Sequence, residues 1–114
     1  MKPQTGFSLH VTIYIKPSDV PTFFEHFKPV YEKVVAEPEC RFFEVYQSLE
    51  DPGTLRWVEN WGASFEWFMG NQAPKEYYKE YLTKTQAMFI QPREMKVFDR
   101  LGPPYYTAKD PYTN

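Results

Sequence analysis

The order in which two apolar periodicities follow one another constrains the fold more than any other feature. Residues 8–16 alternate apolar with polar side chains, which predicts a strand with one buried face, and Pro17 ends it. From Ser18 to about Ala36 apolar residues recur every three or four positions, which predicts a helix that packs one face against the core. Pro29 lies inside this helical pattern, so we expect a kink or a local break there.

Further elements follow in an order that defines the fold class. They are strands at 40–49 and 54–61, joined by the turn 51–53, helices at 65–71 and 75–89, and a strand at 94–101. The complete order is β-α-β-β-α-β, the ferredoxin-like split βαβ arrangement. It predicts an α+β domain in which four strands form one antiparallel sheet and the helices cover one face. The other face then needs a cover, which a second copy of the chain supplies in a dimeric α/β barrel.

The composition changes near the end of the chain and divides a domain from a tail. The 114 residues fit one domain, which we predict over residues 1–101. Residues 102–114 are a tail rich in proline and tyrosine. Either this tail is disordered, as chain ends often are, or its tyrosines dock on the partner subunit of a homodimer.

Charge and composition argue against several classes of function. The formal net charge is −2 and no run of lysine or arginine occurs, so no nucleic-acid partner is expected. The chain has no stretch of 18 apolar residues and no apolar run at its start, so neither a membrane span nor a secretory signal is expected. The single cysteine, Cys40, allows no disulfide within the chain, which favours a reducing, cytoplasmic location. With only two histidines and no glycine-rich phosphate loop, we expect no metal site and no cofactor.

The strongest chemical signal is the segment from Trp57 to Trp67, which contains all three tryptophans of the chain. On a strand, Trp57, Glu59 and Trp61 point to the same face, and Trp67 on the following helix can fold back over them. This arrangement predicts an aromatic pocket that contains one carboxylate and suits a flat aromatic ligand. The alternative is that the tryptophans simply form core.

Glu59 is the candidate proton acceptor of this pocket. A carboxylate among tryptophans has a raised pKa and can act as a general base or acid. In the alternative interpretation Glu59 is a structural residue that pairs with Arg41, Arg56 or a tyrosine hydroxyl.

The remaining candidates lie on the two predicted helices that follow Trp61. Tyr77, Tyr78 and Tyr81 present hydroxyls at helical spacing, which can hydrogen-bond a phenol or a carbonyl group of a substrate. Alternatively, these tyrosines belong to the core, as aromatic stripes at this spacing often do. Asn71 lies where the two helices join and can bind a ligand, cap a helix or face solvent.

These patterns together resemble the antibiotic-biosynthesis-monooxygenase family of dimeric α/β barrels over roughly residues 8–101. The resemblance rests on the element order, on EVYQSLEDPGTLRWVENW, on the helix that starts SFEWF and on the block PKEYYKEYL. The family contains quinol and anthrone monooxygenases that work without metal or flavin, haem-degrading enzymes, and members of unknown activity. The resemblance implies that a cofactor-free member binds an electron-rich phenol, helps it lose a proton, and lets the anion reduce O₂ directly.

The chain keeps only part of the site of the aromatic-polyketide monooxygenases in this family. The tryptophan that ends their third strand looks like Trp61, and an aromatic residue on the following helix looks like Trp67. Their strand asparagine, four residues before that tryptophan, falls at Trp57 here. Their arginine on the later helix falls near Tyr81, so two polar groups of the family's pocket are replaced.

The haem-degrading branch of the family agrees less well with this chain. Its first-strand asparagine looks like Val11, and its histidine falls at Tyr77 or Tyr78. Only its helix tryptophan, which looks like Trp67, is kept. The comparison therefore argues against haem degradation.

The resemblance implies a cofactor-independent monooxygenase that acts on a phenolic, anthrone or other aromatic polyketide-type molecule, with O₂ as co-substrate. In this hypothesis Glu59 is the proton acceptor and Tyr81 the catalytic hydrogen-bond donor. The predicted substrate-binding residues are Trp57, Trp61, Trp67, Asn71, Tyr77 and Tyr78. One alternative is a cofactor-free isomerase, dehydratase, cyclase or decarboxylase on a similar substrate, and another is a non-catalytic ligand-binding dimer.

Overall fold

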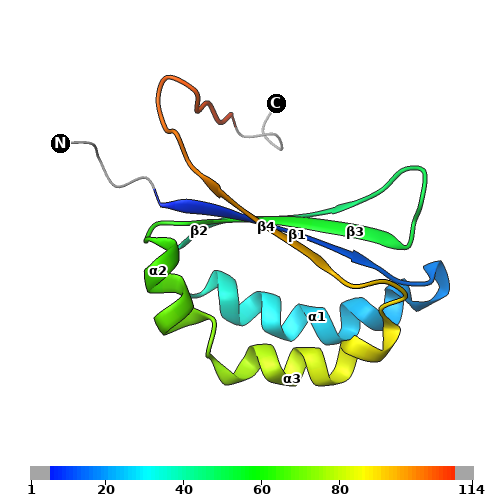
Figure 1. The fold of residues 1–114 in the computed structure, drawn as a ribbon. Coiled ribbons are helices and arrows are strands. Elements are labelled where there is room, and N and C mark those ends of the chain that lie inside the picture. Colours follow the sequence, from blue (N-terminus) through cyan, green and yellow to red (C-terminus); the bar gives the residue numbers. More distant parts are fainter. Residues whose placement is uncertain (1–5, 110–114) are drawn as a thin grey trace.

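A computed structural model describes residues 6–109 and shows one sheet with helices on one side (Figure 1). The elements in chain order are β1 (Phe7–Tyr14), η1 (Pro17–Asp19), α1 (Val20–Val35), β2 (Cys40–Gln47), β3 (Thr54–Trp61), α2 (Phe65–Trp67), η2 (Phe68–Gln72), α3 (Glu76–Thr85), η3 (Gln86–Met88) and β4 (Glu94–Asp99). η1 and η3 are 3-10 turns, and η2 is a π-helical turn. Within the described range no helix combines the length and the hydropathy needed to cross a membrane.

The four strands form one antiparallel sheet in the order β2-β3-β1-β4. β1 is central, and its Leu9 lies opposite Glu59 of β3 on one side and Val97 of β4 on the other. Figure 1 shows α1 and α3 packed along the same face of this sheet. The predicted ferredoxin-like α+β fold is therefore confirmed.

The core lies between this sheet and the two long helices. Leu9, Val11 and Ile13 alternate along β1 and are buried on the helix face, as their period of two predicts. α1 contributes the buried stripe Phe23, Phe27, Val30 and Val34, with the i, i+4, i+7 spacing of one helix face. Each such side chain stabilises the fold by about 1.5–3 kcal/mol when fully buried.

Of the kink or local break expected at Pro29, the break does not occur: α1 runs through the proline without interruption. Pro29 lies on the exposed side of the helix, so its missing N–H and its ring face away from the core. The buried neighbours Phe27 and Val30 pack on the sheet and stabilise the helix on both sides of the proline. Tertiary packing therefore outweighs the local cost of the proline.

The predicted helices after β3 are shorter in the structure than the sequence suggests. The expected helix at 65–71 is one turn of α2 followed by η2, in which the Ala73 N–H donates to the Phe68 carbonyl oxygen five residues earlier (2.8 Å). The expected helix at 75–89 ends as α-helix at Thr85. The π-helical turn holds Gln72, a polar residue, fully buried in the core.

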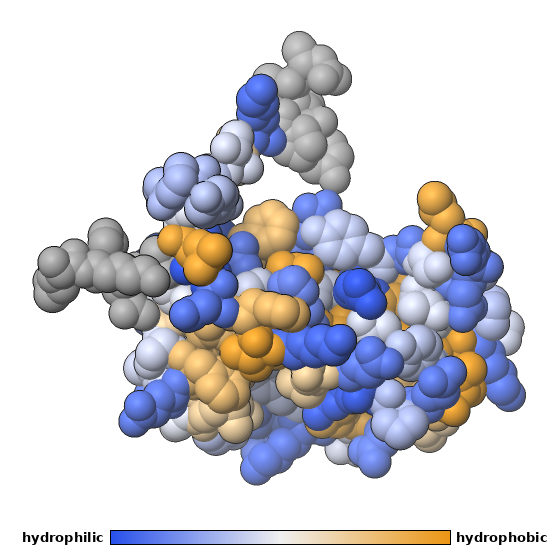
Figure 2. All heavy atoms as spheres, turned by 45° about the horizontal axis from the view of Figure 1, so that its top comes forward, coloured by the Kyte–Doolittle hydropathy of each residue, from blue (hydrophilic) through white to orange (hydrophobic). Residues whose placement is uncertain are grey.

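Within residues 6–109, the second face of the sheet carries several hydrophobic side chains that are partly exposed. Phe42, Tyr46 and Phe98 point to this face and are 41%, 42% and 47% exposed. Figure 2, which turns this side partly toward the reader, shows hydrophobic groups at the surface between hydrophilic ones. The predicted homodimer would cover them, and it stays a prediction.

Candidate functional site

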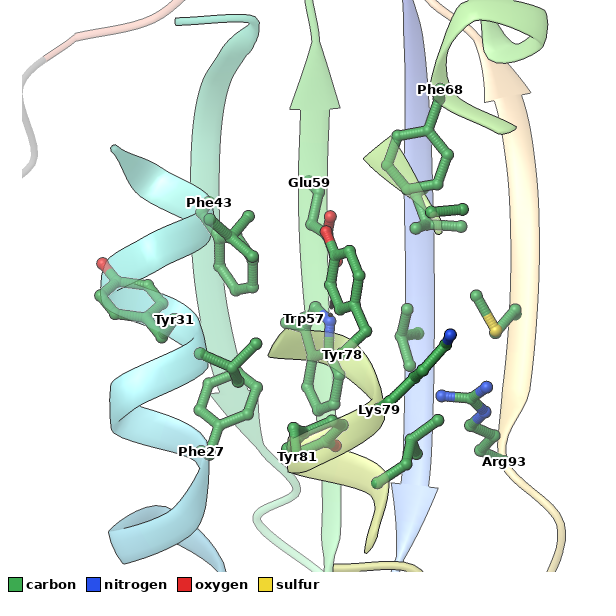
Figure 3. A pocket seen from close by; sticks show the side chains of 17 residues that line it. Phe27, Tyr31, Phe43, Trp57, Glu59, Phe68, Tyr78, Lys79, Tyr81 and Arg93 are labelled. Atoms are coloured by element: carbon green, nitrogen blue, oxygen red, sulfur yellow. Dashed lines mark hydrogen bonds between the residues drawn. The ribbon is translucent and has the colours of Figure 1, made fainter. Parts of the chain in front are cut away.

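A cavity of about 220 Å³ lies between the sheet and the helices (Figure 3). Its lining comes from α1, α3, all four strands and the segments around them, and it is mostly aliphatic and aromatic. The charged residues of the lining are Glu59, Lys79 and Arg93. An apolar cavity of about 150 Å³ already holds a benzene molecule. This cavity therefore has room for a small aromatic ring system.

Glu59 lies in the middle of β3, and its side chain points from the sheet toward the helices. Trp57 and Trp61, two residues before and after it, share this face, as the strand period predicts. The Nε1–H of each indole donates a hydrogen bond to one carboxylate oxygen of Glu59, and both distances are 3.0 Å. The Glu59 side chain is only 5% exposed, so the two indoles replace the water that an exposed carboxylate would bind.

Burial raises the pKa of Glu59 to about 7, and the hydrogen bonds from Trp61 and Trp57 oppose that rise only in part. The carboxyl group therefore exchanges its proton near neutral pH, which suits a general base or acid. Arg56, one of the predicted alternative partners, is engaged elsewhere: its Nε–H donates to Thr12 Oγ1 (2.9 Å), on the opposite face of the sheet. Indole groups, rather than an arginine or a tyrosine, hold the carboxylate.

The aromatic wall beside Glu59 is formed by Trp57 with residues of α1 and α3. The rings of Trp57 and Phe27 lie 4.8 Å apart between centroids, and Phe27 also contacts Tyr81 edge-to-face at 5.9 Å. Tyr81 is buried, and its hydroxyl has no hydrogen-bond partner within residues 6–109. A buried hydroxyl at the cavity wall can donate to an oxygen atom of a bound ligand.

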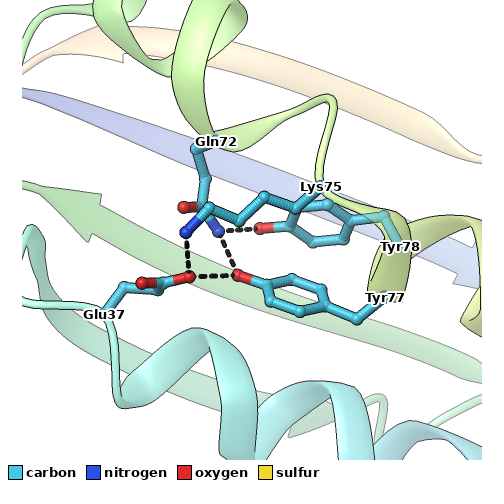
Figure 4. A network of polar contacts seen from close by, with 5 residues as sticks. All are labelled: Glu37, Gln72, Lys75, Tyr77 and Tyr78. Carbon is cyan, nitrogen blue, oxygen red and sulfur yellow. Dashed lines mark hydrogen bonds and ion pairs between the residues drawn. The ribbon is translucent and has the colours of Figure 1, made fainter.

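A polar network lies behind the cavity and ends on Tyr78 (Figure 4). The fully buried Gln72 donates from Nε2 to the hydroxyls of Tyr77 and, at 2.9 Å, of Tyr78. The Tyr77 hydroxyl donates to Glu37 Oε2 at 2.7 Å, and the Lys75 ammonium binds the same oxygen. The Lys75 contact holds the pKa of Glu37 below its ordinary value, so this carboxylate stays charged and fixes the network.

Tyr78 connects this network to the cavity. Its ring lines the cavity that Glu59 also lines, and Figure 3 shows Tyr78 reaching into it from α3. The Tyr78 oxygen accepts a hydrogen bond from Gln72, and the Tyr78 hydroxyl also interacts with the hydroxyl of Tyr77. Burial raises the pKa of Tyr78, so the hydroxyl is protonated and acts as a donor at neutral pH.

The structure brings four of the predicted site residues to the cavity, and leaves four outside its lining. Glu59, Trp57, Tyr78 and Tyr81 line it. The four outside are Trp61, Trp67, Asn71 and Tyr77.

The four residues outside the lining have other contacts. Trp61 is fully buried at the end of β3, under Phe68 (5.1 Å between ring centroids), and reaches Glu59 only through its indole N–H. The Asn71 Nδ2–H donates to the Trp67 carbonyl oxygen (3.0 Å) and its side chain is exposed. Tyr77 belongs to the network behind the cavity. None of these four residues lines this cavity. That they contact a ligand stays a prediction.

Two cations of the lining are not among the residues that the sequence predicts for the site. Lys79 lies on α3, and Arg93 lies in the segment just before β4. No local pattern marks either residue, because the fold alone brings them to one cavity across 14 positions of the chain. Within residues 6–109 no three His, Cys, Asp or Glu side chains lie close enough together to hold a metal ion.

The family described as antibiotic biosynthesis monooxygenase matches residues 6–80, which include β1 to β3, Glu59 and Tyr78. The chain belongs to this family. A protein of Pestalotiopsis microspora named "Putative monooxygenase" is 34% identical over 100 residues, which cover 88% of this chain and 83% of that protein. The antibiotic-biosynthesis-monooxygenase family and this relative support an oxygenase-like enzyme, and they leave the substrate open.

Solved structures of low sequence identity share the fold. One described as "Putative antibiotic biosynthesis monooxygenase from Nitrosomonas europaea" has a TM-score of 0.78 at 17% identity, and the match covers 90% of this chain and 97% of that one. A conserved protein from Methanosarcina mazei has a TM-score of 0.74 at 22% identity, with 83% and 92% covered. At these identities the similarity concerns the fold and not the activity.

Proposed function

We propose that this chain is a cofactor-independent monooxygenase that oxidises a phenolic, anthrone-like or other electron-rich aromatic molecule with O₂. The observation that carries the proposal is the Glu59 carboxylate, buried at the wall of an apolar, aromatic cavity and held by two indole N–H groups. A buried carboxylate is a stronger base than an exposed one, because its charged form is poorly solvated. Membership in the family supports the oxygenase class, and the aromatic lining supports the substrate class.

The reaction would begin with proton transfer from the substrate to Glu59. Loss of a C–H or O–H proton leaves a delocalised anion, which gives one electron to O₂. The resulting superoxide and substrate radical combine to form a C–O bond, and the peroxide anion takes the proton back from Glu59. Loss of water from this hydroperoxide leaves a carbonyl group, so one oxygen atom enters the product and the other leaves with two hydrogens of the substrate.

The tyrosine hydroxyls would bind the oxygen on which the substrate anion places its charge. Tyr81 offers a buried hydroxyl without a partner in the described chain, and Tyr78 lines the same cavity with its hydroxyl oxygen held by Gln72. Donors fixed in advance stabilise a developing negative charge more than water does. Trp57 would form the flat wall against the ring.

The same residues also support proton-transfer chemistry without O₂, such as isomerisation, dehydration, cyclisation or decarboxylation. Glu59 would then return the proton to another atom of the same substrate. Consumption of O₂ separates the two classes, since only the oxygenase requires it. A non-catalytic ligand-binding dimer would use the same cavity, and it would show tryptophan quenching without turnover.

The proposal is tested with Glu59→Gln, which keeps the shape of the side chain and removes its basicity. With a panel of phenols, quinols and anthrones we expect tryptophan quenching in both proteins, but O₂ uptake in the wild type only. The wild-type kcat/KM should rise with pH through an apparent pKa of about 7, the ionisation of Glu59.

The matched control is Glu32→Gln, which removes a carboxylate from the exposed side of α1 and should leave O₂ uptake unchanged. Full O₂ uptake by Glu59→Gln would remove Glu59 from the mechanism. Substrate turnover without O₂ uptake would assign the chain to the proton-transfer class.

A further inference from the structure

The mouth of the cavity carries two positive charges that the proposed reaction does not use. Lys79 and Arg93 are exposed, yet both belong to the lining of the cavity that also contains Glu59. Figure 3 shows their charged ends on the same side of the cavity, Lys79 from α3 and Arg93 beside β4. The cavity is therefore asymmetric, with an aromatic interior and a cationic edge.

Carboxylates near these cations neutralise them incompletely. Lys79 lies 3.5 Å from Glu76, and both side chains are at least 70% exposed, so this contact is weak. No ion pair of Arg93 occurs within residues 6–109. The Arg93 guanidinium is therefore free of a competing internal carboxylate at the point where a ligand enters.

The ligand that fits such a site has an apolar ring and a negative group at one edge. The ring would lie against Trp57 and Phe27, and the charge would stay at the solvent-exposed mouth, where its desolvation costs little. A guanidinium presents parallel N–H groups that match the two oxygens of a carboxylate, and a nearby ammonium adds a point charge.

We propose that the cavity selects an aromatic carboxylate, with the ring inside and the carboxylate bound by Arg93 with help from Lys79. This inference rests on the proposed function, since it names the substrate class of the same site. The cations would also orient the ring, because the edge that carries the carboxylate is fixed at the mouth and another edge faces Glu59.

The test compares two ligands that differ only in the carboxylate, 2-naphthol and 3-hydroxy-2-naphthoate, by tryptophan quenching at low ionic strength. We expect the carboxylate ligand to bind the wild type about tenfold more tightly than 2-naphthol, the equivalent of about 1.4 kcal/mol. Arg93→Gln should abolish this difference without changing the Kd of 2-naphthol. Lys79→Gln should reduce it by less, because Glu76 already offsets part of that charge.

Lys28→Gln is the matched control, because it removes the same charge from an exposed position of α1 outside the cavity lining. It should leave both Kd values unchanged, and circular dichroism should show that all variants are folded. Equal binding of the two ligands to the wild type overturns the carboxylate proposal. In that case, quenching by 2-naphthol together with O₂ uptake would still leave the proposed monooxygenase function intact. A preference that survives Arg93→Gln also overturns it. If neither ligand nor any other phenol binds, both proposals fail.

Discussion

Two glutamates in this chain show how the surroundings of one carboxyl group decide what it can do. Glu37 binds the Lys75 ammonium and the Tyr77 hydroxyl, which lower its pKa, so it is a fixed charge. Glu59 has only neutral indole donors and is buried, which raises its pKa to about 7. Of these two glutamates, Glu59 is therefore the one that can gain and lose a proton near neutral pH.

The raised pKa of Glu59 predicts that folding stability falls as pH rises. The unfolded chain, with a glutamate pKa near 4.5, loses this proton at lower pH than the folded chain does. Between about pH 4.5 and 7 the folded state therefore binds more protons, and the free energy of unfolding decreases by about 3 kcal/mol from this group. Below that window both states are protonated, and above it both are ionised. We expect urea unfolding to show this decrease in the wild type but not in Glu59→Gln.

Glu32→Gln serves as the control, since its carboxyl is exposed on α1 and its variant should keep the wild-type pH dependence. If the wild type and Glu59→Gln lose stability in parallel between pH 4.5 and 8, the carboxyl group of Glu59 does not titrate in that window.

At the scale of elements, the sequence predicts what depends on local periodicity and misses what depends on distant contacts. The same-face position of Trp57, Glu59 and Trp61 follows from the strand period, and the structure has it. The π-helical turn and the burial of Gln72 do not follow, because they depend on packing against α3. The position of Arg93 at the cavity depends on strand pairing and helix packing together, so no short segment of the sequence predicts it.

The hairpin between β2 and β3 offers a prediction at this scale. Gly53 follows Asp51-Pro52, and its carbonyl oxygen accepts a hydrogen bond from the Ile15 N–H (2.9 Å). A Cβ atom at Gly53 would lie 1.9 Å from the Ile15 carbonyl oxygen, a backbone atom that cannot give way alone. We expect Gly53→Ala to lower the free energy of unfolding by about 2–3 kcal/mol in thermal or urea unfolding.

Gly70→Ala is the comparison, because nothing lies within 4 Å of a Cβ atom there and the residue is exposed in η2. It should be neutral or slightly stabilising, since alanine favours helical backbone. Equal stability of the two variants would mean that the turn can move away from β1 at little cost.

At the scale of the molecule, the two faces of the sheet differ in how far other elements cover them. Helices α1 and α3 cover one face and enclose the cavity, while Phe42, Tyr46 and Phe98 of the other face are exposed (Figures 1 and 2). Every residue of β4 is exposed. The exposed aromatic side chains of the open face favour a second layer, and the same face of a second copy of the chain can supply it.

We therefore expect a homodimer in which two open faces pack together, as the barrel arrangement of the sequence analysis predicts. A stable interface of this kind buries roughly 800 Å² on each partner. Phe98→Asp places a charge on the open face beside His10, whose ring lies 4.7 Å from that of Phe98, and should dissociate the dimer in size-exclusion chromatography with light scattering. Leu49→Asp makes the same kind of change at a fully exposed position after β2, and should leave the mass unchanged. A monomeric wild type at tens of micromolar would show that the open face is covered by something other than a second copy.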